Sequence, residues 1–261
     1  LNTPGTTVIN SKISRNHTEL MLKSLNYPIK VQKKGKIDKI FINGLKQFKS
    51  FEYNVPGDIS SASFFIVLTL LSKKSQLIIE GVNVNKSRIG IIQILNKMGA
   101  NIKLKNKKFY KGEEVADIHV RSIAKLNSIN CPSKLNSSAI DEFLIIFLVA
   151  AKAHGVSKFK DLGEMNKKES KRLDLGVKFL KLIGIKVQRF GNDINIHGNP
   201  KIMLSKNFEI MNFLKDHRIF FLSCIAALTL GGKWKINDKD SINTSFPDFL
   251  KTLRHVGAKI Q

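Results

Sequence analysis

One pattern of residues recurs along the chain and excludes most folds. The segments 94–102, 179–187 and 250–260 each read as the end of an amphipathic helix, then a glycine, then a strand. A glycine at that position closes a helix in the left-handed conformation, so each segment predicts a helix-to-strand corner. A weaker fourth copy at 21–31 has Asn26 in place of the glycine, and asparagine tolerates this conformation better than other residues with a side chain. Repetition of this kind indicates stacked supersecondary units.

A second element recurs in step with the first. The segments 60–68, 141–148 and 216–223 each run from polar residues into continuous hydrophobic residues. Helices that are apolar on all sides are buried, so these three are predicted to lie inside the protein. Each is followed by a short strand-like run, at 76–80, 156–160 and 233–237. The predicted unit is therefore a buried helix, a strand, an amphipathic helix, a glycine and a further strand or hairpin.

Three full copies of this unit occupy about 57–126, 127–199 and 200–261, and a partial copy precedes them. A chain of 261 residues has room for one large domain or two modest ones. The alternation of helices and strands predicts an α/β fold whose apolar helices form the shared core.

Charged residues recur at equivalent places in the units. Asp58, Asp141 and Asp216 all stand where an apolar helix is predicted to begin. Helix N-termini attract anions and carry free N–H groups. Three such ends on one face would form a strongly anion-binding rim.

The segment 163–173 contains the densest group of charges, Lys168, Glu169 and Arg172. On a helix, residues four apart share a face, so Lys168 and Arg172 would point the same way and bind an anion beside a titratable carboxylate. The alternative is a solvated, charged helix start. Further charged segments at 139–142 and 215–218 favour a site formed by all three.

The chain is strongly basic, with a formal charge of +24 from 44 basic and 20 acidic residues. Such a charge is typical of nucleic-acid binding. However, only seven of the basic residues are arginine, and the lysines are scattered among Asn and Ile without interleaved aromatics. A proteome-wide composition bias explains that distribution, and an anionic substrate is compatible with it.

Cysteine and histidine usage predicts neither a disulfide framework nor a metal site. Cys131 and Cys224 are far apart and belong to no CxxC pair, which favours a reducing compartment such as the cytoplasm. The longest apolar runs, 143–151 and 219–230, are too short to span a membrane, so a soluble protein is expected. The chain starts at Leu1 rather than Met, which suggests an N-terminal truncation that could hide a signal peptide.

Five segments resemble, in the same order, the motifs of one enzyme family. They are S-R-N-H-T-E-L-M-L at 14–22, V-P-G-D-I-S-S-A-S-F-F at 55–65, K-E-S-K-R at 168–172, D-H-R at 216–218 and S-F-P-D-F at 245–249. The family is enolpyruvyl-shikimate-phosphate (EPSP) synthase, the 3-phosphoshikimate 1-carboxyvinyltransferase of chorismate and aromatic amino-acid biosynthesis.

The resemblance implies a fold of two inside-out α/β domains, each of three βαβαββ units with buried helices. Residues 57–261 would be one complete domain, and residues 1–56 the last, incomplete unit of the other, joined by a hinge at 55–57. The chain would then be a C-terminal fragment with half of an active site that lies between two domains. The fragment alone is expected to be inactive, and the full-length protein to be a monomer.

The resemblance also implies the chemistry. The family transfers the enolpyruvyl group of phosphoenolpyruvate to a hydroxyl of shikimate 3-phosphate through a tetrahedral ketal, then eliminates phosphate, without a cofactor or metal. Asp141 and Glu169 match its catalytic residues, the first engaging the target hydroxyl and the second the methylene proton. Arg172 and Arg218 match its phosphoenolpyruvate-binding residues. Arginine suits such groups because its planar fork binds two oxygens together.

Four positions match contacts to shikimate 3-phosphate: Ser14, Arg15, Asp141 and Lys168. His217 is interpreted either as an orienting residue or as a structural histidine. Two positions depart from the family pattern, since Lys171 and Asn16 stand where aspartate is usual. Lys171 in particular removes an expected ion-pair partner beside Arg172.

Other functions stay open at this stage. A basic nucleic-acid-binding module is one, because RNA phosphate cyclases use a related repeat fold, although the chain lacks the stacking aromatics of single-strand binders. The related enolpyruvyl transferase of cell-wall synthesis is disfavoured by the K-E-S-x-R and D-H-R motifs. An inactive remnant is the third alternative.

Overall fold

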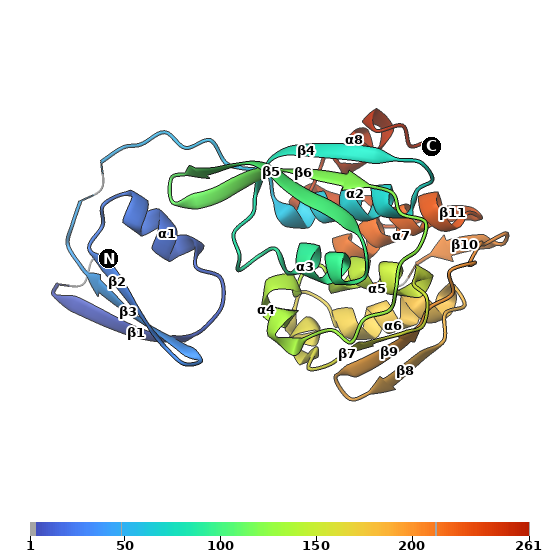
Figure 1. Cartoon of the computed structure of the whole chain (residues 1–261), viewed down its shortest axis with the longest axis horizontal. Helices are drawn as coiled ribbons and strands as arrows, with labels where there is room; N and C mark the ends of the chain where they lie inside the picture. Colours follow the sequence, from blue (N-terminus) through green and yellow to red (C-terminus); the bar gives the residue numbers. More distant parts are fainter. Residues whose placement is uncertain (1–3, 48, 212, 261) are drawn as a thin grey trace.

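A computed structural model describes residues 4–47, 49–211 and 213–260 (Figure 1). The chain begins with β1 (Thr6–Lys12), α1 (His17–Ser24), β2 (Ile29–Lys34) and β3 (Ile37–Asn43). These form an antiparallel sheet of order β1-β3-β2. We call β1 to β3 with α1 the N-terminal unit. In Figure 1 it stands at one end of the molecule.

The first full unit starts with the apolar helix α2 (Ile59–Leu71) and continues with β4 (Gln76–Asn83) and α3 (Gly90–Lys97). The long hairpin of β5 (Asn101–Tyr110) and β6 (Glu113–Arg121) completes it. Its sheet has the order β4-β6-β5 and is antiparallel throughout.

The second unit repeats this plan with shorter strands. Its elements are the 3₁₀ turn η1 (Ser133–Leu135), α4 (Asn136–Ala139), α5 (Phe143–Lys152), β7 (Val156–Phe159), the 3₁₀ turn η2 (Gly163–Lys167), α6 (Arg172–Leu182), β8 (Val187–Phe190) and β9 (Asp193–His197). The sheet order is β7-β9-β8, again antiparallel. In all three sheets, the last strand in sequence therefore lies in the middle.

The third unit consists of β10 (Asn207–Ile210), α7 (His217–Leu230), β11 (Lys233–Ile236), the 3₁₀ turn η3 (Lys239–Thr244) and α8 (Phe249–His255). β10 and β11 pair in parallel. The predicted strand that follows α8 is not formed in the described part of the chain, which ends as coil after Gly257.

The three apolar helices α2, α5 and α7 form the centre of the larger body, and the sheets lie outside them (Figure 1). Every residue of α5 from Phe143 to Ala151 is buried. Aromatic rings join the helices, with Phe221 of α7 at 4.9 Å from Phe64 of α2 and 4.4 Å from Phe249 of α8 between ring centroids. Burial of each such ring stabilises the fold by roughly 1.5–3 kcal/mol. The predicted α/β fold with buried helices is confirmed.

The corner residues also adopt the predicted conformation. The φ angles are 55° at Asn26, 94° at Gly99, 80° at Gly184 and 95° at Gly257. All four residues thus have a positive φ, including Asn26, although no strand follows Gly257 in the described part of the chain.

Two local predictions are wrong. Lys168 and Arg172 do not share a helix, because the backbone is extended at Lys168 and α6 begins only at Arg172. The side chain of Asn166 accepts the backbone N–H of Leu173 at 3.0 Å and so starts α6 from outside the helix. In addition, Asp141 is not a cap: Glu142 holds the N-cap position of α5, and neither side chain caps the helix. Asp58 and Asp216 do cap α2 and α7.

Candidate anion-binding active site

Charges from three separate segments converge on the carboxylate of Asp141, which lies in the turn between α4 and α5. Arg15, from the loop before α1, forms an ion pair with its Oδ2. Lys168 Nζ lies 3.3 Å from its Oδ1, and Arg172 Nη1 lies 3.6 Å from the same atom. One carboxylate therefore faces three cations, two of which come from the segment that follows η2.

The surroundings keep Asp141 ionised. Burial alone would raise the pKa of its carboxyl group, but a hydrogen bond from Arg15 and the charges of Arg218 and Lys168 hold the pKa well below its ordinary range. An ionised carboxylate only accepts hydrogen bonds. Asp141 can therefore accept a hydrogen bond or a proton from a hydroxyl placed beside it.

Arg172 is held rigidly at the first turn of α6, where its side chain is only 2 % exposed. Its Nε donates to Asp216 Oδ2 at 3.0 Å, and the hydroxyl of Ser170 donates to the same oxygen at 2.6 Å. Its Nη2 lies 2.6 Å from an oxygen of Glu169, whose side chain is 69 % exposed. Arg172 thus connects the buried Asp216 to the exposed Glu169.

Arg218 approaches the same place from α7. Its Nη1 donates to the backbone carbonyl of Asp141 at 2.7 Å and lies 4.0 Å from an oxygen of Glu142. Asp216 caps this helix, because its Oδ1 accepts a hydrogen bond from the backbone N–H of Arg218 at 2.8 Å. Its Oδ2 accepts from Arg172, so one carboxylate orients both arginines. Two guanidinium groups beside one another form a pair of donors suited to a multiply charged anion.

A chain of polar side chains leads from Glu142, beside Arg218, to Asp58 at the surface. Ser60 of α2 donates to Glu142 at 2.5 Å and accepts from Arg88 at 2.7 Å, and Arg88 also pairs with Asp58 at 3.2 Å. Burial raises the pKa of the Glu142 carboxyl group, although the nearby charge of Arg218 opposes that shift.

Sequence reasoning did not assign Ser60, Arg88 or Glu142 to the site. The sequence contained a signal for two of them: Ser60 lies inside the motif at 55–65, and Glu142 is next to Asp141. Arg88 belongs to no motif. The one signal for it was that arginine is rare in this chain.

A pocket of about 570 Å³ opens beside these charges. Its lining includes Ser14, Arg15 and Lys168, with Ser137 from α4 and Asp161 from the loop before η2. Ser14 thus lies at the pocket wall, next to Arg15. The structure brings together all of the predicted site residues: Ser14, Arg15, Asp141, Lys168, Glu169, Arg172 and Arg218.

His217 and Lys171 lie at the border of the site. Burial lowers the pKa of the His217 ring, which packs against Phe221 at 5.8 Å between centroids. That environment favours the interpretation of His217 as a structural residue. Lys171 is exposed. Its side chain forms no ion pair in the described part of the chain, and Arg172 pairs with Asp141, Glu169 and Asp216.

The described residues form neither a metal-binding cluster nor a membrane-spanning helix. Within residues 4–47, 49–211 and 213–260, no group of three or more His, Cys, Asp or Glu side chains is arranged to hold a metal ion. None of the helices in these ranges has the length and apolar character needed to cross a bilayer.

Comparison with known proteins gives one consistent result. The family model of EPSP synthase (3-phosphoshikimate 1-carboxyvinyltransferase) matches residues 1–253. The chain is 38 % identical over 247 residues to the 3-phosphoshikimate 1-carboxyvinyltransferase of Ruthia magnifica subsp. Calyptogena magnifica, which covers 95 % of the chain and 55 % of that relative. It is 36 % identical over 250 residues to the enzyme of the same name from Staphylococcus aureus (strain JH9), covering 95 % and 56 %.

Solved structures agree with the family match. EPSP synthase from Acinetobacter baumannii superimposes with a TM-score of 0.88 at 31 % identity, covering 99 % of this chain and 58 % of that one. The enolpyruvyl transferase NikO from Streptomyces tendae shares the fold, with a TM-score of 0.70 at 15 % identity over 99 % and 57 % of the two chains. The chain spans about half the length of the curated relatives it matches.

Proposed function

The chain belongs to the EPSP synthase family, and from that premise we propose that it takes part in the transfer of the enolpyruvyl group from phosphoenolpyruvate to a hydroxyl of shikimate 3-phosphate, with release of phosphate. This step belongs to chorismate and aromatic amino-acid biosynthesis. The observation that carries the proposal is the convergence of Arg15, Lys168 and Arg172 on Asp141, with Arg218 bound to the Asp141 carbonyl.

Both substrates are multiply charged anions, so the first requirement is electrostatic binding. Arg172 and Arg218 would bind phosphoenolpyruvate, since both guanidinium groups are fixed by buried or backbone acceptors and lie beside Asp141. Ser14, Arg15 and Lys168 would bind shikimate 3-phosphate, since all three line the open pocket. Fixed donors of this kind need no reorganisation when the substrate arrives.

Proton transfer is the second requirement. Asp141 would engage the attacking hydroxyl as a hydrogen-bond acceptor, because its lowered pKa keeps it as a carboxylate among four cations. Glu169 would add a proton to the methylene carbon and later remove it. Its side chain is exposed at the rim and tied to Arg172, so it is positioned by the same residue that would bind phosphoenolpyruvate.

We further propose that residues 1–56 are one unit of a second domain and that residues 57–261 are a three-unit domain. The three-stranded sheet of the N-terminal unit, which repeats the order found in the two later sheets, supports this division. Activity in the cytoplasm, as a monomer and without nucleic acid, is part of the same proposal. Both Cys131 and Cys224 are free and buried, as expected in a reducing compartment.

The test is a reconstituted enzyme. The 261-residue chain is mixed with a polypeptide made of the part of the Ruthia magnifica relative that the match does not cover. We expect phosphate release that depends on both phosphoenolpyruvate and shikimate 3-phosphate. The control is the same relative divided at the matching position and mixed from its own two parts. If that control turns over and the hybrid does not, the proposed function is wrong.

A further inference from the structure

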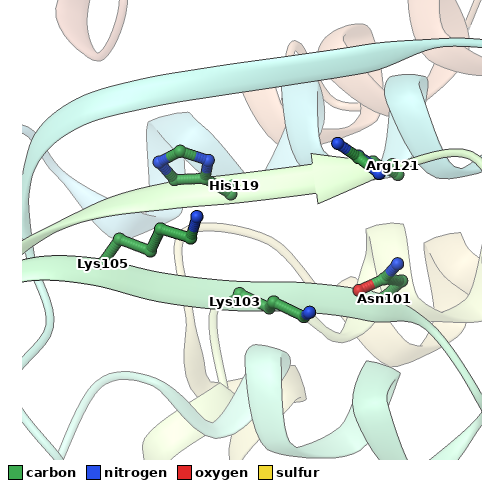
Figure 2. Close-up of a pocket in the computed structure, with 5 residues that line it drawn as sticks. All are labelled: Asn101, Lys103, Lys105, His119 and Arg121. Carbon is green, nitrogen blue, oxygen red and sulfur yellow. The ribbon is translucent and has the colours of Figure 1, made fainter.

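Four basic side chains gather on the outer face of the sheet β4-β6-β5, away from the candidate active site. Lys103 and Lys105 come from β5, and His119 and Arg121 come from the neighbouring strand β6 (Figure 2). With Asn101 they line a pocket of about 120 Å³. None of these five residues lines the pocket beside Asp141.

The strand register brings the three cations and His119 within reach of one small anion. Lys103 lies directly opposite His119, and Asn101 lies directly opposite Arg121. Opposed side chains on antiparallel strands start about 5 Å apart, and neighbours on one face of a strand start about 7 Å apart. Long lysine and arginine side chains bridge such distances easily. A pocket of this size between them suits a group with one or two phosphates.

These basic side chains form no ion pair with a carboxylate in the part of the chain that the structure describes. No ion pair involves Lys103, Lys105, His119 or Arg121 there. The carboxylate nearest in register is Asp117, opposite Lys105. Asp117 forms no ion pair with Lys105; its oxygens accept hydrogen bonds from Asn106 at 2.7 Å and from the backbone N–H of Gly81 at 2.9 Å. Unbalanced positive charge in a concave site attracts anions.

The repeated fold supplies an internal comparison. If the cluster only reflected the lysine-rich composition, the same positions of the other two antiparallel sheets would also be basic. By strand register, the equivalent residues are Gln188, Phe190, Asn195 and His197 in the second unit, and Lys30, Gln32, Phe41 and Asn43 in the N-terminal unit. Each of these sheets has one basic residue where β5 and β6 have four. The concentration is therefore particular to the sheet β4-β6-β5.

An apolar residue borders the cluster. Ile78 of β4 lies opposite His119 in the sheet and is 54 % exposed. We propose that this pocket is a second anion site, which binds the phosphate or diphosphate group of a small molecule, with Ile78 in contact with the rest of that molecule. The site is separate from the proposed transferase site, and neither depends on the other.

The test is a titration of the 261-residue chain with sodium pyrophosphate, followed by ¹H–¹⁵N NMR. We expect saturable shifts of the backbone amides of residues 101–105 and 119–121, which report this pocket independently of the site at Asp141. The double variant K103Q/R121Q should weaken that binding by about tenfold or more, because charge-assisted hydrogen bonds to phosphate are lost. Both side chains are exposed, so the remaining amide signals should show an unchanged fold.

The matched control is Lys30→Gln, at the position equivalent to Lys103 in the N-terminal sheet. It should leave pyrophosphate binding unchanged. Equal binding by wild type and K103Q/R121Q, or an equal loss in Lys30→Gln, would overturn the proposal. A second arm replaces pyrophosphate with a single-stranded DNA oligonucleotide. Steeply salt-dependent binding of the oligonucleotide without any binding of pyrophosphate would also overturn it, in favour of a nucleic-acid surface.

Discussion

Asp141 sets the electrostatic character of the candidate site, because it is the residue on which cations from different segments meet. Arg15, Lys168 and Arg172 contact its carboxylate, and Arg218 binds its backbone carbonyl. The carboxylate balances part of their charge and keeps them from separating. Glu169, Asp216 and Glu142 also face these cations, so the site offers an anionic substrate fixed guanidinium donors rather than a large excess of charge.

Glu169→Gln should lower the turnover of the reconstituted enzyme by roughly two to four orders of magnitude, with little change in substrate affinity. The reason is that the amide keeps the shape of the exposed Glu169 side chain beside Arg172 but cannot exchange a proton. Steady-state phosphate release measures both quantities. Glu209→Gln, which removes another exposed ion-paired carboxylate on β10, serves as the control and should turn over normally. Normal turnover by the Glu169 variant would mean that another group moves the proton.

Asp216→Asn should lower the free energy of unfolding by about 3 kcal/mol at neutral pH, because Arg172 loses the one fully buried carboxylate among its three partners. The two side chains are 1 % and 2 % exposed. Asparagine caps a helix about as well as aspartate, so the start of α7 is preserved. Urea denaturation measures the change. Asp174→Asn, which removes the exposed partner of Arg189, should cost less than about 1 kcal/mol.

The same variant should change how stability depends on pH. Burial opposes the shift, but the charge of Arg172 and a hydrogen bond from Ser170 lower the pKa of Asp216 in the folded protein. The unfolded value is about 3.9. The stabilisation is therefore complete above about pH 4 and is lost as the pH falls through the lower, folded value. Asp216→Asn should flatten that part of the curve, and an unchanged acid limb would contradict the assignment.

At the scale of elements, the repeated helix-to-strand corner is the structural signature of the fold. Asn26, Gly99 and Gly184 each end a helix with positive φ and lead into a strand that pairs at the edge of a three-stranded sheet. The corner reverses the direction of the chain, so that the amphipathic helix before it can pack on the sheet that contains the strand after it. This explains why the conformation persists where the residue is asparagine.

Gly99→Ala and Gly184→Ala should each lower the free energy of unfolding by about 1–2 kcal/mol, because alanine is strained at positive φ. Contacts contribute little: the nearest atom to an added Cβ is 3.8 Å away at Gly99, and none lies within 4 Å at Gly184. Urea denaturation of both variants should give similar values. Gly57→Ala is the control, since its φ is outside the left-handed region and its Cβ would lie 3.5 Å from Val82. A loss at Gly57 as large as at the corners would contradict this explanation.

The parts of the fold that follow from local pattern could be predicted from the sequence. Continuous apolar residues predicted the buried helices α2, α5 and α7, and the glycine corners predicted the repeats. The segment 168–172 could not be predicted correctly, because its spacing fits a helix while Asn166, seven residues before Leu173, decides where α6 begins. The convergence on Asp141 follows from tertiary packing, so only the motifs pointed to it.

At the scale of the whole molecule, the N-terminal unit is attached through a small set of polar and aromatic contacts. His17 lies 2.5 Å from Glu113, and Asn16 accepts a hydrogen bond from Asn85 at 2.9 Å. Farther along, the rings of Tyr53 and Tyr110 are 5.4 Å apart. Arg15 extends this contact into the candidate site, so the position of the unit and the charge around Asp141 are linked.

The last prediction concerns residues 1–261 on their own. We expect them to bind neither substrate well and to show no detectable transfer, because the relatives are almost twice as long and the family's catalysis places two reactants between two domains. Such positioning can contribute on the order of 7–11 kcal/mol to lowering the barrier. Arg172 and Arg218 can hold one anion, and within residues 4–47 Ser14 and Arg15 reach the site from the proposed second domain. Isothermal titration with shikimate 3-phosphate and phosphoenolpyruvate, followed by a phosphate-release assay, measures both. The reconstituted enzyme is the positive control, and micromolar binding or steady turnover by residues 1–261 alone would show that these residues suffice.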